Sequence, residues 1–85
     1  MEIDASWCPT CAKQRPIIAH LANEPEFKSL MIYKVDFDTQ KDVVREMGAR
    51  MQSTLIVLNG TAERGRSVGD TDETSIKALL EKANP

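Results

Sequence analysis

The chain has 85 residues, of which 41 % are hydrophobic and 28 % are charged, and its formal net charge is −2. These values are ordinary for a soluble globular protein and predict a single domain over residues 1–85. A slightly acidic chain without a basic run does not suit nucleic acid, and no apolar stretch approaches the ~20 residues that cross a bilayer. Its 2 cysteines are too few for the disulfide framework of a small secreted protein.

The first part of the chain predicts a short strand followed by a helix. The stretch MEIDAS reads as the end of a strand, and Pro9 suits the first turn of a helix, where its missing N–H would be unpaired anyway. Pro16 falls inside this helix and should kink it. The helical stripe of apolar residues consists of Ile17, Ile18, Leu21 and Ala22, whereas Lys13, Gln14 and Arg15 are expected to face water.

The middle of the chain predicts a second strand and a second helix. The run LMIYKVDFD, residues 30–38, is rich in β-forming side chains and predicts a buried strand. Asp38 or Thr39 is then expected to cap a helix that ends at Gly48.

The last part of the chain predicts a hairpin and a final helix. Residues 54–58 (TLIVL) predict an apolar strand, Asn59-Gly60 a turn, and residues 63–68 (ERGRSV) a more polar strand that ends at Gly69. Thr71 should cap the final helix, whose inner face is formed by Ile76, Leu79 and Leu80. The order β-α-β-α-β-β-α predicts an α/β fold, a mixed four-stranded sheet with helices on both faces.

The two cysteines, Cys8 and Cys11, form a C-x-x-C motif that could bind a metal, cross-link the fold or exchange electrons. A zinc site needs about four ligands. His20 is the only histidine, and it lies nine positions after Cys11, which is too far along a helix that rises about 1.5 Å per residue. A disulfide that closes so short a loop adds little stability. A C-x-x-C motif that opens a helix after a strand is instead typical of thiol–disulfide redox exchange.

The sequence WCPTC around the cysteines resembles the active site of the thioredoxin superfamily. Further markers follow in the same order along the chain. Pro16 resembles the helix-kinking proline of the family, KVDFD a strand signature, TLIVLNG the strand and turn after its cis-proline, and Gly69 the glycine beside its active site. The resemblance covers nearly the whole chain and implies a thioredoxin-like fold that is short at its N-terminus.

We expect Cys8 to occupy the N-cap of the first helix, where free N–H groups and the helix dipole stabilise a thiolate. Cys8 would then attack the substrate, and Cys11, one turn deeper, would resolve the mixed disulfide. A lowered thiol pKa is already known for the C-x-x-C motif of thioredoxin. With Pro9, the motif C-P-x-C also resembles glutaredoxins and oxidising periplasmic members of the superfamily, so the direction of electron flow stays open.

Glu2 and Lys34 correspond in this resemblance to a buried acid and a lysine on the neighbouring strand, which pair beneath the second cysteine. Glu2 would then accept the proton of Cys11 during resolution. The alternative is that Glu2 is a solvated residue near the chain end and that Lys34 lies at a sheet edge.

Ser53 stands where the family usually has its cis-proline. A cis bond before a non-proline residue costs about 2.5–4 kcal/mol, so we expect the Gln52–Ser53 bond to be trans. The resemblance implies that this loop faces Cys8 and binds an extended peptide, and the Ser53 hydroxyl either reaches the Cys8 sulfur or only fills space. The residues expected to bind substrate are Trp7, Pro9, Thr10, Gln52, Ser53 and Gly69.

The sequence therefore predicts a monomeric thiol–disulfide oxidoreductase that acts on protein disulfides without a bound cofactor or metal. Its electron partner would be a thiol reductase or oxidase. The alternatives are a glutathione-dependent, glutaredoxin-like enzyme and a redox-inactive interaction module of the same fold. The expected location is the cytoplasm or, if a removed leader preceded Met1, the bacterial periplasm.

Overall fold

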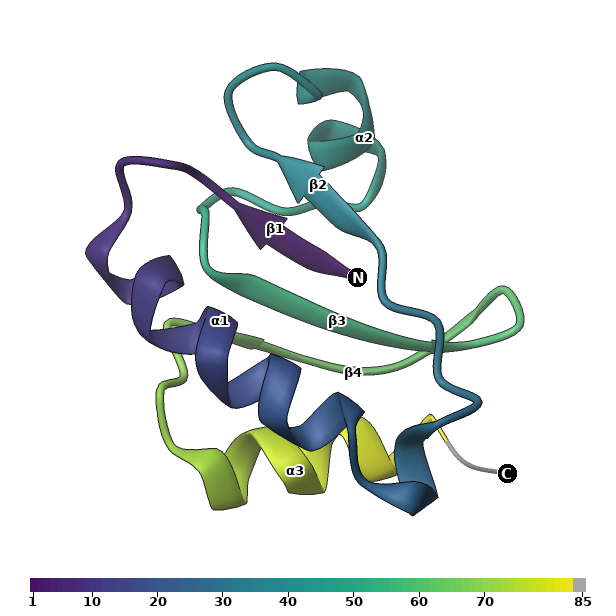
Figure 1. Ribbon diagram of the computed structural model, residues 1–85. Helices are drawn as coiled ribbons and strands as arrows, with labels where there is room; N and C mark the ends of the chain where they lie inside the picture. Colours follow the sequence, from purple (N-terminus) through teal and green to yellow (C-terminus); the bar gives the residue numbers. More distant parts are fainter. Residues whose placement is uncertain (84–85) are drawn as a thin grey trace.

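The computed structural model describes residues 1–83 and confirms the predicted order of strands and helices (Figure 1). The elements are β1 (Glu2–Asp4), α1 (Pro9–Ala22), the short 3-10 helix η1 (Pro25–Phe27), β2 (Lys34–Asp36), α2 (Lys41–Glu46), β3 (Thr54–Asn59), β4 (Ala62–Val68) and α3 (Glu73–Glu81). Residues 84 and 85, the end of the predicted domain, lie outside the described residues. None of the helices in the described part is both long and apolar enough to cross a membrane.

The four strands form one mixed sheet in the order β2-β1-β3-β4. β1 and β2 are parallel and are joined through α1, whereas β3 runs antiparallel to both β1 and β4. Parallel neighbours need a crossover connection, and α1 supplies it. β1 and β3 are therefore the interior strands, with neighbours on both sides.

Helices cover both faces of the sheet, as predicted (Figure 1). α1 and α3 lie on one face, over a core of Ile18, Leu21, Phe27, Leu55, Val57, Ile76, Leu79 and Leu80. α2 lies on the other face, where the core is made of Ile3, Val35, Val44 and Ala49. Because side chains alternate along a strand, Ile3 points toward α2, and Glu2 and Asp4 point toward α1.

The predicted strand over residues 30–38 is wrong in its extent, because only Lys34–Asp36 is a strand. Met31, Ile32 and Tyr33 are 69 %, 37 % and 55 % exposed, so most of the run is not buried. The pairing partner limits the strand: β1 has only three residues, and they register with Lys34, Val35 and Asp36. A strand continues only as far as a neighbour accepts its hydrogen bonds.

The predicted helix caps are also wrong in detail. α2 begins after Gln40, whose side chain makes no capping bond, and the Oδ1 atom of Asp36 accepts the N–H groups of Asp38 and Thr39 instead. α3 begins after Asp72 rather than after Thr71.

The predicted breaks at glycines are confirmed. Gly48 follows the end of α2 with φ of 69°, and Gly69 follows β4 with φ of 72°. Both lie in the left-handed region, which glycine enters without steric cost.

Candidate active site

Cys8 is the N-cap residue of α1, as predicted, and Pro9 takes the first helical position. Its backbone is extended, and its Sγ accepts the N–H of Cys11 at 3.2 Å. Cys8 and Cys11 are free thiols and are 2 % and 1 % exposed, packed with Ala5 and Phe37. The local sequence thus sets the first sulfur against the open N-terminus of a helix.

The pKa of Cys8 is lowered although burial acts to raise it. Hydrogen bonds from the Cys11 thiol, the Cys11 N–H, the Gln52 side chain and the Thr10 N–H favour the thiolate and outweigh burial. Hydrogen bonding to the charged form is the usual way in which a buried thiol becomes acidic.

Cys11 behaves in the opposite way. Burial raises the pKa of the Cys11 thiol to about 12, and hydrogen bonding with Cys8 and with the Asp4 carboxylate adds to the effect. The two thiols are therefore unequal: the pKa of Cys8 is lowered, and the pKa of Cys11 is raised.

Ser53 lies in the loop before β3, in a left-handed conformation with φ of 59°. No cis peptide bond occurs within residues 1–83, so the Gln52–Ser53 bond is trans, as expected. The Ser53 N–H donates to the Ile3 carbonyl at 2.8 Å, and the Ser53 carbonyl accepts the Gly69 N–H at 3.0 Å. These bonds hold a serine in a region that costs about 1–3 kcal/mol.

The Ser53 hydroxyl is not among the groups with the largest effects on the Cys8 pKa, and Gln52 supplies the contribution of this loop. Ser53 itself is 4 % exposed, which fits the reading of a small buried loop residue.

Gln14 is a site residue that the sequence reasoning missed. It is 1 % exposed, so the expectation that it faces water is wrong. Its Nε2 donates to the Ser53 carbonyl at 3.1 Å and to the Asp70 carbonyl at 2.9 Å. The spacing of three residues from Cys11 was a usable signal, because such positions share one helix face.

Arg15 was also expected to face water, and it is instead half-buried in an ion pair with Asp4. Its Nε and Nη2 each donate to a separate Asp4 oxygen at 2.8 Å, and Nη2 also donates to the Ala5 carbonyl at 3.0 Å. This hydrogen bonding lowers the pKa of Asp4. Asp4 was not selected from the sequence, although strand alternation directs it toward α1.

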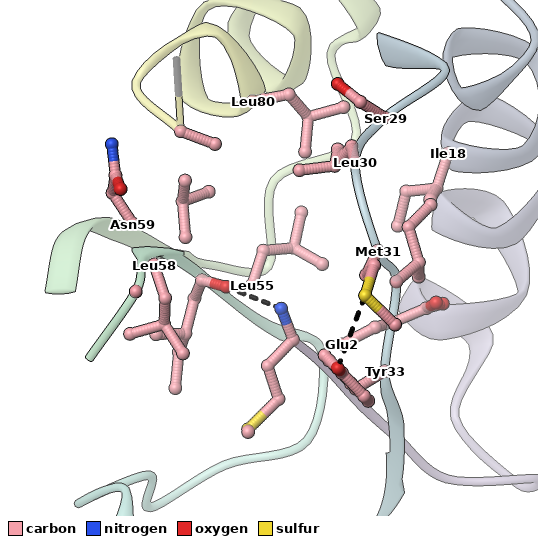
Figure 2. A pocket seen from close by; sticks show the side chains of 16 residues that line it. Glu2, Ile18, Ser29, Leu30, Met31, Tyr33, Leu55, Leu58, Asn59 and Leu80 are labelled. Atoms are coloured by element: carbon pink, nitrogen blue, oxygen red, sulfur yellow. Dashed lines mark hydrogen bonds between the residues drawn. The ribbon is translucent and has the colours of Figure 1, made fainter. Parts of the chain in front are cut away.

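Glu2 and Lys34 are neighbours in the β1–β2 register, as expected. Glu2 is 3 % exposed, which excludes the solvated alternative, whereas Lys34 is exposed on the edge strand. Burial raises the pKa of Glu2, and the charge of Lys34 partly offsets this. Glu2 lines a hollow of about 420 Å³. Figure 2 shows Glu2 there together with Ile18, Leu55 and Leu80.

Of the other residues predicted to bind substrate, Trp7, Pro9 and Thr10 are next to the cysteines in the chain, and Gly69 is hydrogen-bonded to Ser53. Trp7 is 57 % exposed, and its Nε1 donates to Asp38 Oδ2 at 2.7 Å. Pro9 is exposed and Thr10 half-buried at the start of α1, and Gly69 is tied to Ser53 through its N–H. Met51 and Val68, the chain neighbours of Gln52 and Gly69, are apolar residues that are 52 % and 55 % exposed.

A buried thiol of lowered pKa at a helix N-cap, with a second thiol of raised pKa three residues later, is the arrangement of a thiol–disulfide exchange site. The comparisons with known proteins agree with this class. The chain matches the Thioredoxin family over residues 1–82. It is 30 % identical over 78 residues to Thioredoxin 1 of Nostoc sp., an alignment that covers 92 % of this chain and 72 % of that protein.

Two solved structures are similar over most of their length. Trxlp from Edwardsiella tarda EIB202 superposes with a TM-score of 0.90 at 34 % identity, covering 93 % of this chain and 77 % of that one. The thioredoxin of Malassezia sympodialis gives 0.82 at 26 % identity, covering 96 % and 72 %. The chain belongs to the thioredoxin family and is a protein disulfide oxidoreductase.

Proposed function

We propose that the protein exchanges its Cys8–Cys11 dithiol with disulfide bonds of other proteins through a mixed disulfide. The observation that carries this proposal is the inequality of the thiols: the pKa of Cys8 is lowered, and that of Cys11 is raised to about 12. Cys8 is therefore the thiol that attacks the substrate, and Cys11 keeps its proton until the mixed disulfide is resolved. Residues 1–85 would act as one domain and as a monomer, with no bound cofactor.

In the reducing direction, the Cys8 thiolate attacks one sulfur of a substrate disulfide, and the other substrate sulfur leaves as a thiolate. Cys11 then loses its proton and attacks Cys8 Sγ. The bond between Cys8 and the substrate breaks, and its electron pair leaves on the substrate sulfur. Two electrons pass to the substrate and a Cys8–Cys11 disulfide forms; the reverse sequence oxidises a substrate dithiol.

Substrate docking is assigned to the rim formed by Trp7, Pro9, Thr10, Gln52, Ser53 and Gly69. The Trp7 ring, next to Cys8 in the chain, is exposed, and the Gln52 side chain hydrogen-bonds with Cys8. The Ser53 N–H already donates to Ile3, so Ser53 has no free backbone donor for a peptide. We therefore expect main-chain contacts to come from the neighbours of Ser53.

The division of labour is tested by single substitutions of the cysteines. Cys11→Ser should attack a protein disulfide and remain attached, because no second thiol resolves the product. Cys8→Ser should form no adduct and show no activity. Trapped adducts are separated by non-reducing electrophoresis and identified by mass. Adducts on Cys8→Ser with none on Cys11→Ser would reverse the assignment of the two roles.

Reduction of insulin disulfides separates this function from the alternatives. A thioredoxin-like enzyme should reduce insulin when a dithiol is the electron donor. A glutaredoxin-like enzyme should require glutathione, and an interaction module should give no reduction with either donor. The Cys8→Ser variant provides the background rate.

A further inference from the structure

Ser53 has an unfavourable backbone conformation within the rim to which substrate docking is assigned. Its φ of 59° lies in the left-handed region, which costs energy for residues other than glycine. Serine has no ring that fixes φ, as proline has. A conformation of this kind persists only where the surrounding structure imposes it. The contacts of Ser53 therefore decide whether this part of the rim keeps its shape.

Three hydrogen bonds fix the Ser53 backbone, and their partners come from three different parts of the chain. The Ser53 N–H donates to the Ile3 carbonyl of β1 at 2.8 Å, and the Ser53 carbonyl accepts the Gly69 N–H at 3.0 Å. The same carbonyl accepts Nε2 of Gln14, on α1, at 3.1 Å. Of these three bonds, the one from Gln14 is made by a side chain.

Gln14 also holds a second loop. Its Nε2 donates to the Asp70 carbonyl at 2.9 Å, and Asp70 directly follows Gly69 in the chain. The amide of Gln14 has two N–H bonds, which suffices for one carbonyl in each loop. The Asp70 carboxylate accepts the N–H of Asp72, the N-cap residue of α3. One buried side chain therefore connects the loop before β3 and the loop after β4 to α1.

The helix that makes these connections also carries both cysteines. Cys8 is the N-cap of α1, Cys11 lies in its first turn, and Gln14 follows about one turn later. Gln14 is 1 % exposed, so little water competes for its amide. Its position thus relates the two loops to the helix that carries the reacting sulfurs.

We propose that Gln14 is a positioning residue, which through its bonds to Ser53 and Asp70 holds Ser53 and Gly69 in the arrangement that docks a protein substrate. This inference rests on the proposed function and adds a residue to the same site. Gln14 acts through the two loops and takes no part in the transfer of electrons or protons. Without its two donors, the rim should loosen and bind protein disulfides more weakly.

Amide hydrogen exchange measures whether Gln14 holds the loops. The N–H groups of Ser53 and Gly69 each donate a hydrogen bond, as does the N–H of the buried Ile56 on β3. Exchange at Ser53 and Gly69 is expressed relative to exchange at Ile56, which removes the effect of a change in overall stability. Gln14→Leu should raise this relative rate about 10-fold, the effect of about one hydrogen bond.

The kinetics of insulin reduction with a dithiol as electron donor measure the effect on docking. Gln14→Leu should raise the KM for insulin about 3- to 10-fold and change kcat by less than about twofold, because binding is lost and not chemistry. Iodoacetamide needs no docking surface. Its rate with the fully ionised Cys8, read from the plateau at high pH, should stay within about twofold of the wild type.

Ile18→Val is the matched control. Ile18 is a buried core residue of the same helix, and the loss of one methyl group weakens the core without removing a hydrogen bond from either loop. Both the relative exchange rate and the KM should stay within about twofold of the wild type. Gln14→Met keeps an unbranched side chain without a donor, and it replaces Gln14→Leu if that variant does not fold.

An unchanged relative exchange rate in the folded Gln14 variant overturns the proposal, as does an unchanged KM or an equal rise of the KM in Ile18→Val. A wild-type protein that reduces no insulin contradicts the proposed function itself. In that case faster exchange at Ser53 and Gly69 would still support the contact between Gln14 and the loops.

Discussion

At the scale of single residues, the reactivity of Cys8 comes from its partners and not from exposure. A thiol that is 2 % exposed would ordinarily have a raised pKa, and burial does act in that direction here. Hydrogen bonds to the Cys8 sulfur outweigh burial, so the pKa of Cys8 is lowered instead of raised. The side chains that hydrogen-bond with the sulfur, those of Cys11 and Gln52, should therefore control the pKa of Cys8.

Gln52→Ala should raise the pKa of Cys8, because it removes a hydrogen bond that favours the thiolate. The measurement is the rate of Cys8 alkylation as a function of pH, and the mid-point should move to higher pH. Ser53→Ala is the matched control, with a curve that overlays the wild type. A shift in Ser53→Ala without one in Gln52→Ala would show that the hydroxyl contacts the thiolate instead.

Ser53→Pro should destabilise the fold, although proline is the family's usual residue here. Proline cannot adopt φ of 59° and has no N–H to donate to Ile3. The free energy of unfolding should fall by about 3 kcal/mol, as measured by urea denaturation. Ser53→Gly is the control and should stay within about 1 kcal/mol, because glycine tolerates a positive φ. Equal stability of the two variants would mean that the loop rearranges freely.

At the scale of elements, α1 organises the whole site from one helix. Its N-cap presents Cys8, its first turn carries Cys11, and the next turn directs Gln14 and Arg15 to different neighbours. Gln14 joins the loop before β3 to the loop after β4, which makes α1 a support for both loops beside the thiols.

Gln14→Leu should lower the free energy of unfolding by about 1–3 kcal/mol, because the carbonyls of Ser53 and Asp70 each lose a hydrogen bond from a buried side chain. Urea denaturation measures the stability of Gln14→Leu and of the control variant Lys13→Ala. Lys13 is an exposed neighbour on the same helix, and its substitution should change stability by less than about 0.5 kcal/mol. Similar stabilities would mean that Gln14 does not hold the two loops together.

At the scale of the whole molecule, Glu2 is an acid buried beside the sheet, and its burial lowers the stability of the fold at neutral pH. Burial raises the folded-state pKa of Glu2, so the folded protein binds this proton more tightly than the unfolded chain does. Such a group lowers stability as the pH rises above its unfolded pKa, and the loss is complete above its folded pKa. Asp4 has the opposite sign, because its pKa is lowered and its contribution disappears in acid.

Glu2→Gln should therefore raise the free energy of unfolding at neutral pH, and the gain should shrink as the pH falls toward about 4. Urea denaturation at both pH values measures it. Glu46→Gln, on the exposed side of α2, is the control and should show no such pH-dependent gain. A constant effect of Glu2→Gln across this range would show that its charge does not influence folding.

The predictions that were confirmed depend on local signals. The N-cap at Cys8, the breaks at Gly48 and Gly69 and the inner face of α3 follow from spacing and from residue type alone. Polar residues were assigned to water by the same spacing, and this failed for Gln14 and Arg15. Gln14 is buried because it hydrogen-bonds with carbonyls of two distant loops, and Arg15 because it pairs with the carboxylate of Asp4 on β1. A local stretch of sequence does not reveal such distant partners. The predicted length of β2 was wrong for a similar reason, because pairing with the short strand β1 sets where β2 begins and ends.

The two edges of the sheet have a consequence for solubility. β2 offers only three residues to an incoming strand, and β4 carries Glu63, Arg64 and Arg66 next to an irregularity in its pairing at Val57 and Leu58. Short edges, charges and bulges are the means by which sheets avoid joining one another into fibrils. Edges of this kind should therefore keep the folded protein from pairing its sheet with exposed strands of other chains.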